Sequence, residues 1–189
     1  MMNHIDFIFE TINHFLKTKE HIIIAIDGRC AAGKSTLAKR LKEKMSCCVI
    51  HMDDFFLRPE QRTPQRYREP GGNVDYERFL EEVLKPLHEN HPFSFRPYDC
   101  KRQLLAEPVS IVPDSVTVIE GSYSCHPVLW DFYDLRIFLT INKAEQLRRI
   151  RYRNGEEATI IFQNKWIPLE EFYFKTYNIE NRCDLHFEA

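Results

Sequence analysis

The sequence predicts an α/β fold with about five parallel strands, and three observations lead to this prediction. The chain has 189 residues, which matches one compact domain at roughly 100–200 residues per domain. It contains several short, uninterrupted apolar runs, the pattern of strands that are covered on both faces. Helix-like segments separate most of these runs, as parallel strands require. We therefore expect a single domain over residues 1–189.

Each expected element rests on its own local pattern. The expected strands are the apolar runs at residues 21–27, 47–53, 116–121, 135–141 and 184–188. The expected helices cover residues 1–20, 34–45, 76–84, 143–152 and 169–181. The first of these helices is amphipathic and is expected to pack outside the sheet. Pro86 is expected to end the helix at 76–84, and Asn142 to cap the helix that begins at residue 143.

Two segments interrupt the alternation of strands and helices. Residues 93–112 contain the β-prone pieces FSFRPYD and PVSIV, which we interpret as a hairpin arm outside the main sheet. Residues 58–72 carry prolines, a Gly pair and several arginines without apolar periodicity, so they are expected to form a long loop. Loops of this length within compact domains are usually functional or disordered.

Composition excludes several classes of protein. The 28 acidic residues outnumber the 26 Lys and Arg, and this formal net charge of −2 does not favour nucleic acid. The six cysteines form no C-x-x-C pair, which argues against structural zinc and against a disulfide scaffold. No stretch approaches the roughly 20 apolar residues of a membrane span, and the first twenty residues do not resemble a signal peptide. We expect a cytoplasmic monomer or homo-oligomer without nucleic-acid or membrane partners.

The strongest motif directly follows the first expected strand. Residues 28–35 read GRCAAGKS, the G-x-x-x-x-G-K-S/T pattern of a phosphate-binding loop, or P-loop. Its glycines let backbone N–H groups turn toward a polyphosphate, and the N-terminus of the next helix stabilises the negative charge. The expected nucleotide-binding residues are Gly28, Arg29, Cys30, Ala31, Ala32, Gly33, Lys34, Ser35 and Thr36. Among them, Lys34 is expected to contact the β- and γ-phosphates, and the Ser35 hydroxyl to bind Mg²⁺.

Carboxylates follow two further strands. Asp53 and Asp54 come after the second strand, and Glu120 ends the third buried run, VTVIE. Ligands of open α/β sheets bind at the carboxyl ends of the strands, so these groups should lie beside the P-loop. Asp53 suits a base that accepts a hydroxyl proton, with a further role beside the metal, and Glu120 suits a magnesium ligand. Asp54 is expected only to cap the next segment.

Taken in order, these motifs resemble a known group of kinases. The runs AIDGRCAAGKSTLA, HMDDFF, NVDYERF, RPYD, VIEGSY and LRRIRYRNG are similar to the uridine kinase, phosphoribulokinase and pantothenate kinase group of P-loop kinases. The resemblance is strongest to uridine kinase-like proteins. It implies a P-loop NTPase fold and ATP-dependent phosphorylation of a small-molecule hydroxyl, with ATP and Mg²⁺ as cofactors. It also implies that Asp53 is the catalytic base, that Glu120 serves the metal, and that Asp75, Tyr98 and Asp99 contact the acceptor.

The chain departs from uridine kinases on the acceptor side. Cys100 and Lys101 follow Tyr98-Asp99 where those enzymes carry a His and soon afterwards an Arg, and Phe56 stands where they often show Tyr. Such changes can alter selection between related substrates by orders of magnitude. The Arg-rich segment from Arg58 to Arg68 suits an acceptor that bears a phosphate or carboxylate. We therefore hypothesise that the acceptor is itself anionic, with Phe56 beside it.

Four arginines gather in one expected helix, at positions 148, 149, 151 and 153. Arg149 and Arg153 share a helix face at i, i+4. In the kinase interpretation, residues 148–168 form a lid over ATP whose arginines neutralise the transferring phosphoryl group, and Arg149 and Arg153 take this catalytic role. Tyr152 interrupts the similarity to the family, which leaves Arg151 and Arg153 as competing candidates for the family's basic residue, and Arg151 is assigned to the substrate side.

Other interpretations remain at this level. A P-loop ATPase or nucleotide-dependent switch would use the arm and the Arg-rich loop to contact a protein partner. The run at residues 142–145, NKAE, mimics the guanine-reading Asn-Lys-x-Asp but has Glu where Asp is needed, so ATP is favoured over GTP. Cys30 is either an oxidisable thiol at a helix N-terminus, whose field lowers a thiol pKa, or a small filler. His51 is expected to be a core histidine.

Overall fold

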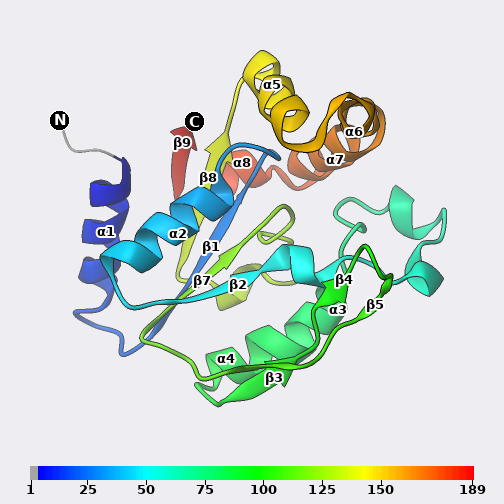
Figure 1. Cartoon of the computed structure of the whole chain (residues 1–189). Helices are drawn as coiled ribbons and strands as arrows, with labels where there is room; N and C mark the ends of the chain where they lie inside the picture. Colours follow the sequence, from blue (N-terminus) through cyan, green and yellow to red (C-terminus); the bar gives the residue numbers. More distant parts are fainter. Residues whose placement is uncertain (1–3) are drawn as a thin grey trace.

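The computed structural model describes residues 4–189 and is built on a five-stranded parallel sheet (Figure 1). In spatial order the strands are β2 (Cys48–His51), β7 (Val116–Glu120), β1 (Ile22–Gly28), β8 (Leu135–Thr140) and β9 (Leu185–Glu188). All neighbouring pairs are parallel, which confirms the predicted α/β fold. The carboxyl ends of the strands therefore share one edge, where the P-loop and the two strand-end carboxylates meet.

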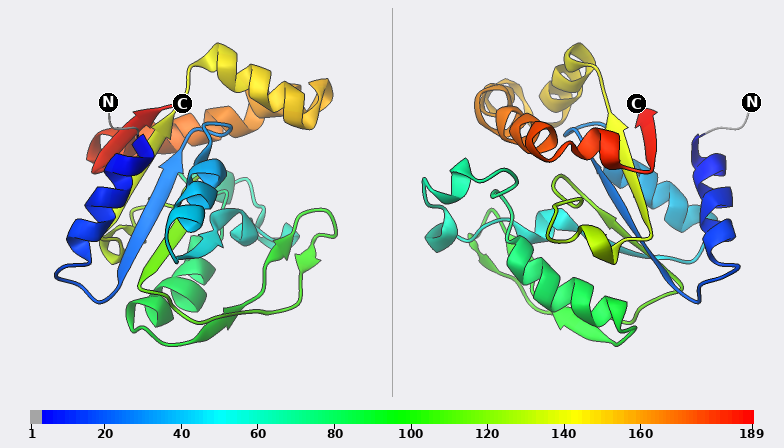
Figure 2. Two further views of the ribbon diagram at one scale, coloured as in Figure 1. Left: turned by 60° about the vertical axis from the view of Figure 1, so that its left-hand side comes forward. Right: turned by 180° about the vertical axis from the view of Figure 1, so that it is seen from behind.

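Both faces of the sheet are covered because alternate side chains of β1 point to opposite sides. Ile22, Ile24 and Ile26 pack in one apolar cluster with α1 (His4–Phe15) and α2 (Lys34–Lys44). Ile23 and Ala25 pack in a second cluster with helices from later in the chain. Figure 2 shows these two helical layers on either side of the sheet. The helix expected at 1–20 ends at Phe15, and residues 1–3 of that range lie outside the described residues.

The main helix of the second layer continues through a proline that was expected to end it. Helix α3 (Tyr76–Phe79) passes into the π-helical segment η4 (Leu80–Leu84) and then into α4 (Lys85–His88), which contains Pro86. The expected end at residue 84 is therefore wrong. Pro86 has no N–H to donate, and its ring would crowd a carbonyl one turn earlier. The wider π turn, in which the Lys85 N–H donates to the Leu80 carbonyl, accommodates the proline.

The lid region lies at the carboxyl edge of the sheet. Helix α5 (Lys143–Asn154) begins at Asn142, whose Oδ1 accepts the Glu145 N–H at 3.0 Å, so the predicted cap is confirmed. Gly155, with a φ of 86°, separates α5 from α6 (Glu156–Ile161). Only glycine adopts that backbone conformation readily, which explains the sharp corner between the two helices.

The last helix of the sequence prediction has different boundaries in the structure. Helix α6 continues through the π-helical η6 (Phe162–Trp166) into α7 (Ile167–Tyr177), and α8 (Ile179–Arg182) follows separately. The prediction of one helix over residues 169–181 is therefore wrong. Asn178 takes a left-handed φ of 52° and ends α7, a role for which asparagine is second only to glycine.

The arm and the Arg-rich loop lie outside the main sheet. In the arm, β3 (Phe93–Phe95) pairs with β6 (Val109–Ile111), and β4 (Tyr98–Asp99) pairs with β5 (Leu104–Leu105), both antiparallel. The loop contains two short 3₁₀ turns, η2 (Pro59–Gln61) and η3 (Arg66–Arg68). Further 3₁₀ turns follow β2 and precede β8, at η1 (Met52–Phe55) and η5 (Trp130–Phe132). Within residues 4–189, no helix combines the length and the apolar character that crossing a membrane would require.

Candidate active site

The P-loop connects β1 to α2 in a fixed geometry. At Gly28, where φ is +131°, an added Cβ would stand 2.0 Å from the Leu139 carbonyl oxygen, so only glycine fits beside β8. Lys34 turns back over the loop and donates from Nζ to the Gly28 carbonyl at 2.6 Å and to the Ser122 hydroxyl at 3.3 Å. The first N–H groups of α2, from Lys34 to Thr36, have no acceptor within the helix. They are the donors that a phosphate group would meet.

A fully buried carboxylate that the sequence prediction missed supports this loop. The two oxygens of Asp27 accept the N–H groups of Gly28, Tyr123 and Cys125 at 2.7, 3.1 and 2.9 Å, and the Tyr173 hydroxyl at 2.8 Å. Burial raises the pKa of Asp27 to about 6, although these donors and the Lys34 charge act to lower it. Asp27 thus ties together the P-loop, the segment after β7 and helix α7. The position of Asp27 at the end of an apolar strand is the feature of the sequence that could have indicated this role.

The predicted magnesium-side residues lie together. The Ser35 hydroxyl donates to Glu120 Oε2 at 3.1 Å, and His51 Nδ1 lies 2.5 Å from Glu120 Oε1. The expectation that His51 is a core histidine is wrong: its side chain is half exposed, and the bond to Glu120 raises its pKa. His51 is exposed because its strand ends there, at the edge of the sheet.

Asp53 follows the same strand and reaches the same space. Its side chain is accessible from the cavity. The surrounding protein atoms nevertheless reduce its hydration, and this desolvation raises the pKa of Asp53, while the positive charge of Lys34 acts to lower it. A carboxylate with a raised pKa is a better proton acceptor near neutral pH. One or two carboxylates and a hydroxyl, completed by phosphate oxygens and water, are the donor set that Mg²⁺ prefers. Asp53, Glu120 and Ser35 therefore fit that ion.

All these groups open on one cavity of about 880 Å³. Its wall is formed by the P-loop, the ends of β2 and β7, the lid and the Arg-rich loop. Many of the predicted site residues line it: Cys30, Ala31, Gly33, Lys34, Ser35, Thr36, Asp53, Phe56, Glu120, Arg149 and Arg153. It is also lined by residues to which the sequence prediction gave no individual role, several of them within its Arg-rich segment or its lid: Leu57, Arg62, Tyr67, Asn73, Cys100, Ser122, Tyr123, Phe162, Lys165, Trp166 and Glu170.

Two of the four lid arginines line the cavity. Arg149 donates from Nη1 to the Ala31 carbonyl of the P-loop at 3.2 Å and pairs with Glu145 on its own helix. Arg153 lies one turn further along the same face and also lines the cavity. Arg151 does not line it and instead pairs with Glu156 at 2.5 Å. The sequence left Arg151 and Arg153 as competing candidates, and the position of Arg153 at the cavity favours Arg153.

Helix α7 holds the P-loop through two adjacent glutamates. Glu170 accepts the Cys30 N–H at 3.0 Å and the Ser122 hydroxyl at 2.6 Å, and it lines the cavity. Glu171 pairs with Arg29 at 2.7 Å, which directs the Arg29 side chain toward α7. Arg29 therefore does not line the cavity, and Gly28 and Ala32 serve the loop through their backbone. Nothing in the sequence near Glu170 signalled this contact, because its partners lie 140 and 48 residues away.

The same arrangement decides the character of Cys30. Burial and the charge of Glu170 raise the pKa of the thiol, whereas Lys34 acts to lower it. The expectation of a thiol activated by a helix N-terminus is therefore contradicted. Cys30 is a buried filler whose carbonyl and sulfur are contacted by Gln146.

Three predicted acceptor contacts do not line the cavity. The Tyr98 ring is buried, and its hydroxyl accepts Arg62 Nη2 at 2.7 Å. Asp99 accepts the N–H groups of the hairpin turn, while its neighbour Cys100 lines the cavity. Asp75 caps α3 through the Arg78 N–H and accepts Gln61 Nε2 at 2.8 Å. In this structure these three residues position the arm and the loop, and their contact with an acceptor stays a prediction.

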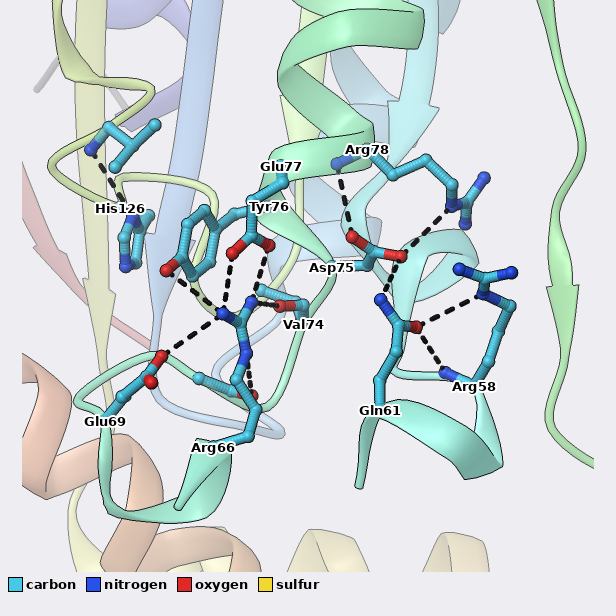
Figure 3. A network of polar contacts seen from close by, with 12 residues as sticks. Arg58, Gln61, Arg66, Glu69, Val74, Asp75, Tyr76, Glu77, Arg78 and His126 are labelled. Atoms are coloured by element: carbon cyan, nitrogen blue, oxygen red, sulfur yellow. Dashed lines mark hydrogen bonds and ion pairs between the residues drawn. The ribbon is translucent and has the colours of Figure 1, made fainter. Parts of the chain in front are cut away.

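The Arg-rich loop is held by one of its own arginines (Figure 3). The Arg66 guanidinium donates to the carbonyls of Gly72 and Val74 and pairs with Glu69 and Glu77. It also lies 4.3 Å from the centre of the Tyr76 ring. The Arg66 side chain therefore stabilises the loop through these contacts.

The other arginines of the loop have different surroundings. Arg58 pairs with Glu60, and Arg68 is exposed on η3. Neither Arg58, Arg66 nor Arg68 lines the cavity, whereas Arg62 does.

Comparisons with known proteins agree with this geometry. A family model described as an AAA domain matches residues 24–171. Nicotinamide riboside kinase 2 from Mus musculus is 32% identical over 139 residues, which span 70% of this chain and 68% of that protein. A possible uridine kinase from Bacillus stearothermophilus has a TM-score of 0.73 at 22% identity over 97% of this chain and 96% of that chain. D-glycerate 3-kinase from Cryptococcus neoformans has a TM-score of 0.64 at 14% identity over 98% and 93%. The last two share the fold.

The fold, the P-loop and the relative together define a class: this protein is an ATP-dependent small-molecule kinase, a phosphotransferase with a hydroxyl acceptor. The chain belongs to the AAA domain family and to the family of mouse nicotinamide riboside kinase 2. This result confirms the predicted kinase and the resemblance to the uridine kinase group, and it disfavours the nucleotide-dependent switch.

Proposed function

We propose that this protein transfers the γ-phosphate of Mg-ATP to a hydroxyl of a nucleoside-like acceptor, with Asp53 as the base. The observation that carries the proposal is the shared cavity, in which Asp53 faces the P-loop and the Ser35–Glu120 pair. Transfer of a phosphoryl group requires the acceptor oxygen, the base and the phosphate to meet in one water-poor space.

Each group then has a defined task. The amides of α2 and Lys34 hold the phosphates, and Arg149 and Arg153 stabilise the charge that spreads over the transferring group. When bound, Mg²⁺ neutralises the phosphate oxygens, and Ser35 and Glu120 would hold it. Asp53 accepts the proton of the acceptor hydroxyl, a task that its raised pKa favours.

The lining supports a flat ring on the acceptor. Phe56, Tyr67, Phe162 and Trp166 offer aromatic surfaces within the same cavity, and such surfaces stack on nucleobase or pyridine rings. The mouse relative is named for a riboside with such a ring.

The test is a measurement of ADP release with Mg-ATP against a panel of nucleosides and other alcohols. Asp53→Asn should lower kcat by about 10²–10⁴-fold, the range of general-base contributions, while ATP binding stays within a few-fold. Asp54→Asn is the matched control, since Asp54 is adjacent, is of the same type and does not line the cavity. Equal losses in the two variants, or no loss in Asp53→Asn, would exclude Asp53 as the base.

A further inference from the structure

We infer that the acceptor carries an anionic group, a carboxylate or phosphate, and that Arg62 and Lys165 bind this group. The inference rests on the proposed function, because it concerns the second substrate of the same cavity. It goes beyond the sequence hypothesis in naming one arginine of the Arg-rich loop and one lysine of the lid.

The negative charges of the cavity are all gathered at the P-loop. Glu120 is bonded to Ser35, Glu170 is bonded to Cys30, and Asp53 lies within electrostatic reach of Lys34. These are the only Asp and Glu side chains that line the cavity within residues 4–189. The remaining wall thus offers no carboxylate to a positively charged acceptor.

The positive charges are divided between two places. Lys34, Arg149 and Arg153 belong to the P-loop and to the lid helix beside it, where the phosphates of ATP require them. Arg62 comes instead from the Arg-rich loop, and Lys165 from η6. Their charges are in excess of what nucleotide binding uses.

Arg62 is held rigidly without a counter-charge. Its Nε donates to the Leu57 carbonyl at 3.0 Å, its Nη2 donates to the Tyr98 hydroxyl at 2.7 Å, and its guanidinium lies 5.6 Å from the centre of the Tyr98 ring. It is half-buried, and no carboxylate of the described residues lies within 4.0 Å of it, whereas Arg58 and Arg66 of the same loop both have such partners. A partly buried cation without a counter-ion is costly, and an anionic ligand relieves that cost.

Lys165 is also placed without a carboxylate partner in the described part of the chain. Its Nζ lies 4.9 Å from the centre of the Tyr67 ring and 4.3 Å from that of Trp166. Tyr67 belongs to the Arg-rich loop and Trp166 to the lid, so the ammonium group bridges the two walls of the cavity. All three residues line it.

The cationic wall and the Asp53 carboxylate open on the same cavity. Cys100 lines the cavity as well, and burial raises the pKa of its thiol, while the charge of Arg62 acts to lower that pKa and the charge of Asp53 to raise it. An acceptor whose hydroxyl meets Asp53 can therefore place its anionic group near Arg62 while its ring contacts Phe56. A pyridinium acceptor such as nicotinamide riboside would bring a positive charge against this wall, which costs binding energy.

The experiment compares acceptors that differ in one charged group. The pairs are uridine with orotidine, nicotinamide riboside with nicotinic acid riboside, and glycerol with both D-glycerate and glycerol 3-phosphate. The first two pairs and D-glycerate report a carboxylate, and glycerol 3-phosphate reports a phosphate. We expect the member that carries the carboxylate or phosphate in at least one pair to show a kcat/KM at least tenfold higher in the wild-type protein.

The variants identify the residues that cause this preference. Arg62→Gln should lower kcat/KM for the preferred anionic acceptor by about 30- to 100-fold, the loss of one charge-assisted hydrogen-bonding partner, and Lys165→Gln by about five- to tenfold. Activity on the member that lacks the carboxylate or phosphate should change by less than about threefold. Arg68→Gln removes a charge of the same loop outside the cavity and should change neither. Thermal melting of each variant controls for folding.

The outcomes separate this inference from the proposed function. If the members without a carboxylate or phosphate are turned over as well as those with one, and Arg62→Gln leaves their ratio unchanged, the inference is overturned while the kinase remains. If no acceptor of the panel stimulates ADP release, the binding of the same pairs is measured by calorimetry in the presence of a non-hydrolysable ATP analogue. This measurement then decides whether the protein prefers an anionic group. Anion-selective binding that Arg62→Gln abolishes supports the inference, and binding without charge preference refutes it.

Discussion

The buried carboxylate of Asp27 offers a test of how the P-loop is held. Replacing Asp27 with Asn keeps the side-chain shape and removes the charge. One oxygen can still accept the N–H groups of Gly28 and Tyr123, but an NH₂ group then faces the Cys125 N–H. The Tyr173 hydroxyl can reverse its role and accept. One buried N–H loses its acceptor, which costs about 1–3 kcal/mol of folding stability.

The negative charge of Asp27, in contrast, lowers the folding stability of the wild type, and this effect depends on pH. The folded state binds the Asp27 proton more tightly, because the pKa of Asp27 is about 6 in the folded chain against an ordinary value of 3.8. The contribution of Asp27 to stability is therefore full below pH 3.8 and is lost as pH rises through 6. At about 1.4 kcal/mol for each unit of pKa, the loss is about 3 kcal/mol, and roughly half of it falls between pH 5 and pH 8.

The assay is urea unfolding of the wild type and Asp27→Asn, followed by tryptophan fluorescence from pH 5 to pH 8. The stability advantage of the wild type should narrow by about 1.5 kcal/mol over this range. Tyr173→Phe keeps the carboxyl group but removes a donor that lowers its pKa, so its stability should fall with pH at least as much as that of the wild type. The difference in free energy of unfolding between the wild type and Asp27→Asn could instead stay constant or widen as pH rises. That result would refute a raised pKa of Asp27, because the hydrogen bonds would then outweigh burial and hold this pKa low.

Two further predictions concern the same loop. Gly28→Ala should cost several kcal/mol more than Gly33→Ala, because its Cβ would meet the Leu139 backbone whereas a Cβ at Gly33 meets nothing within 4 Å; equal melting temperatures of the two variants would contradict this. Glu170→Gln keeps an acceptor for the Cys30 N–H but removes a negative charge beside the phosphate site. It should tighten ATP binding about fivefold, as expected for about 1 kcal/mol of relieved repulsion. Calorimetry that shows weaker binding would contradict the expected repulsion.

The sequence alone determined those features whose residues lie close together in the chain. The P-loop is one run of eight residues between a strand and a helix, so its pattern is complete in the text. The strand-end positions of Asp53 and Glu120 follow because parallel strands bring their carboxyl ends to one edge. The face shared by Arg149 and Arg153 follows from the helical repeat, which also explains why Arg151 points elsewhere.

Only the tertiary structure decided which residues complete the cavity. Glu170 and Lys165 reach it because the chain turns at Gly155 and continues through a π segment into α7. No local pattern encodes that path. The different roles of the arginines in the Arg-rich loop also depend on tertiary contacts. Arg66 is engaged in ion pairs, whereas the buried Tyr98 of the arm holds Arg62 at the cavity. Local periodicity records which face of an element is apolar, but the partner of a charge is set by segments far away in the sequence.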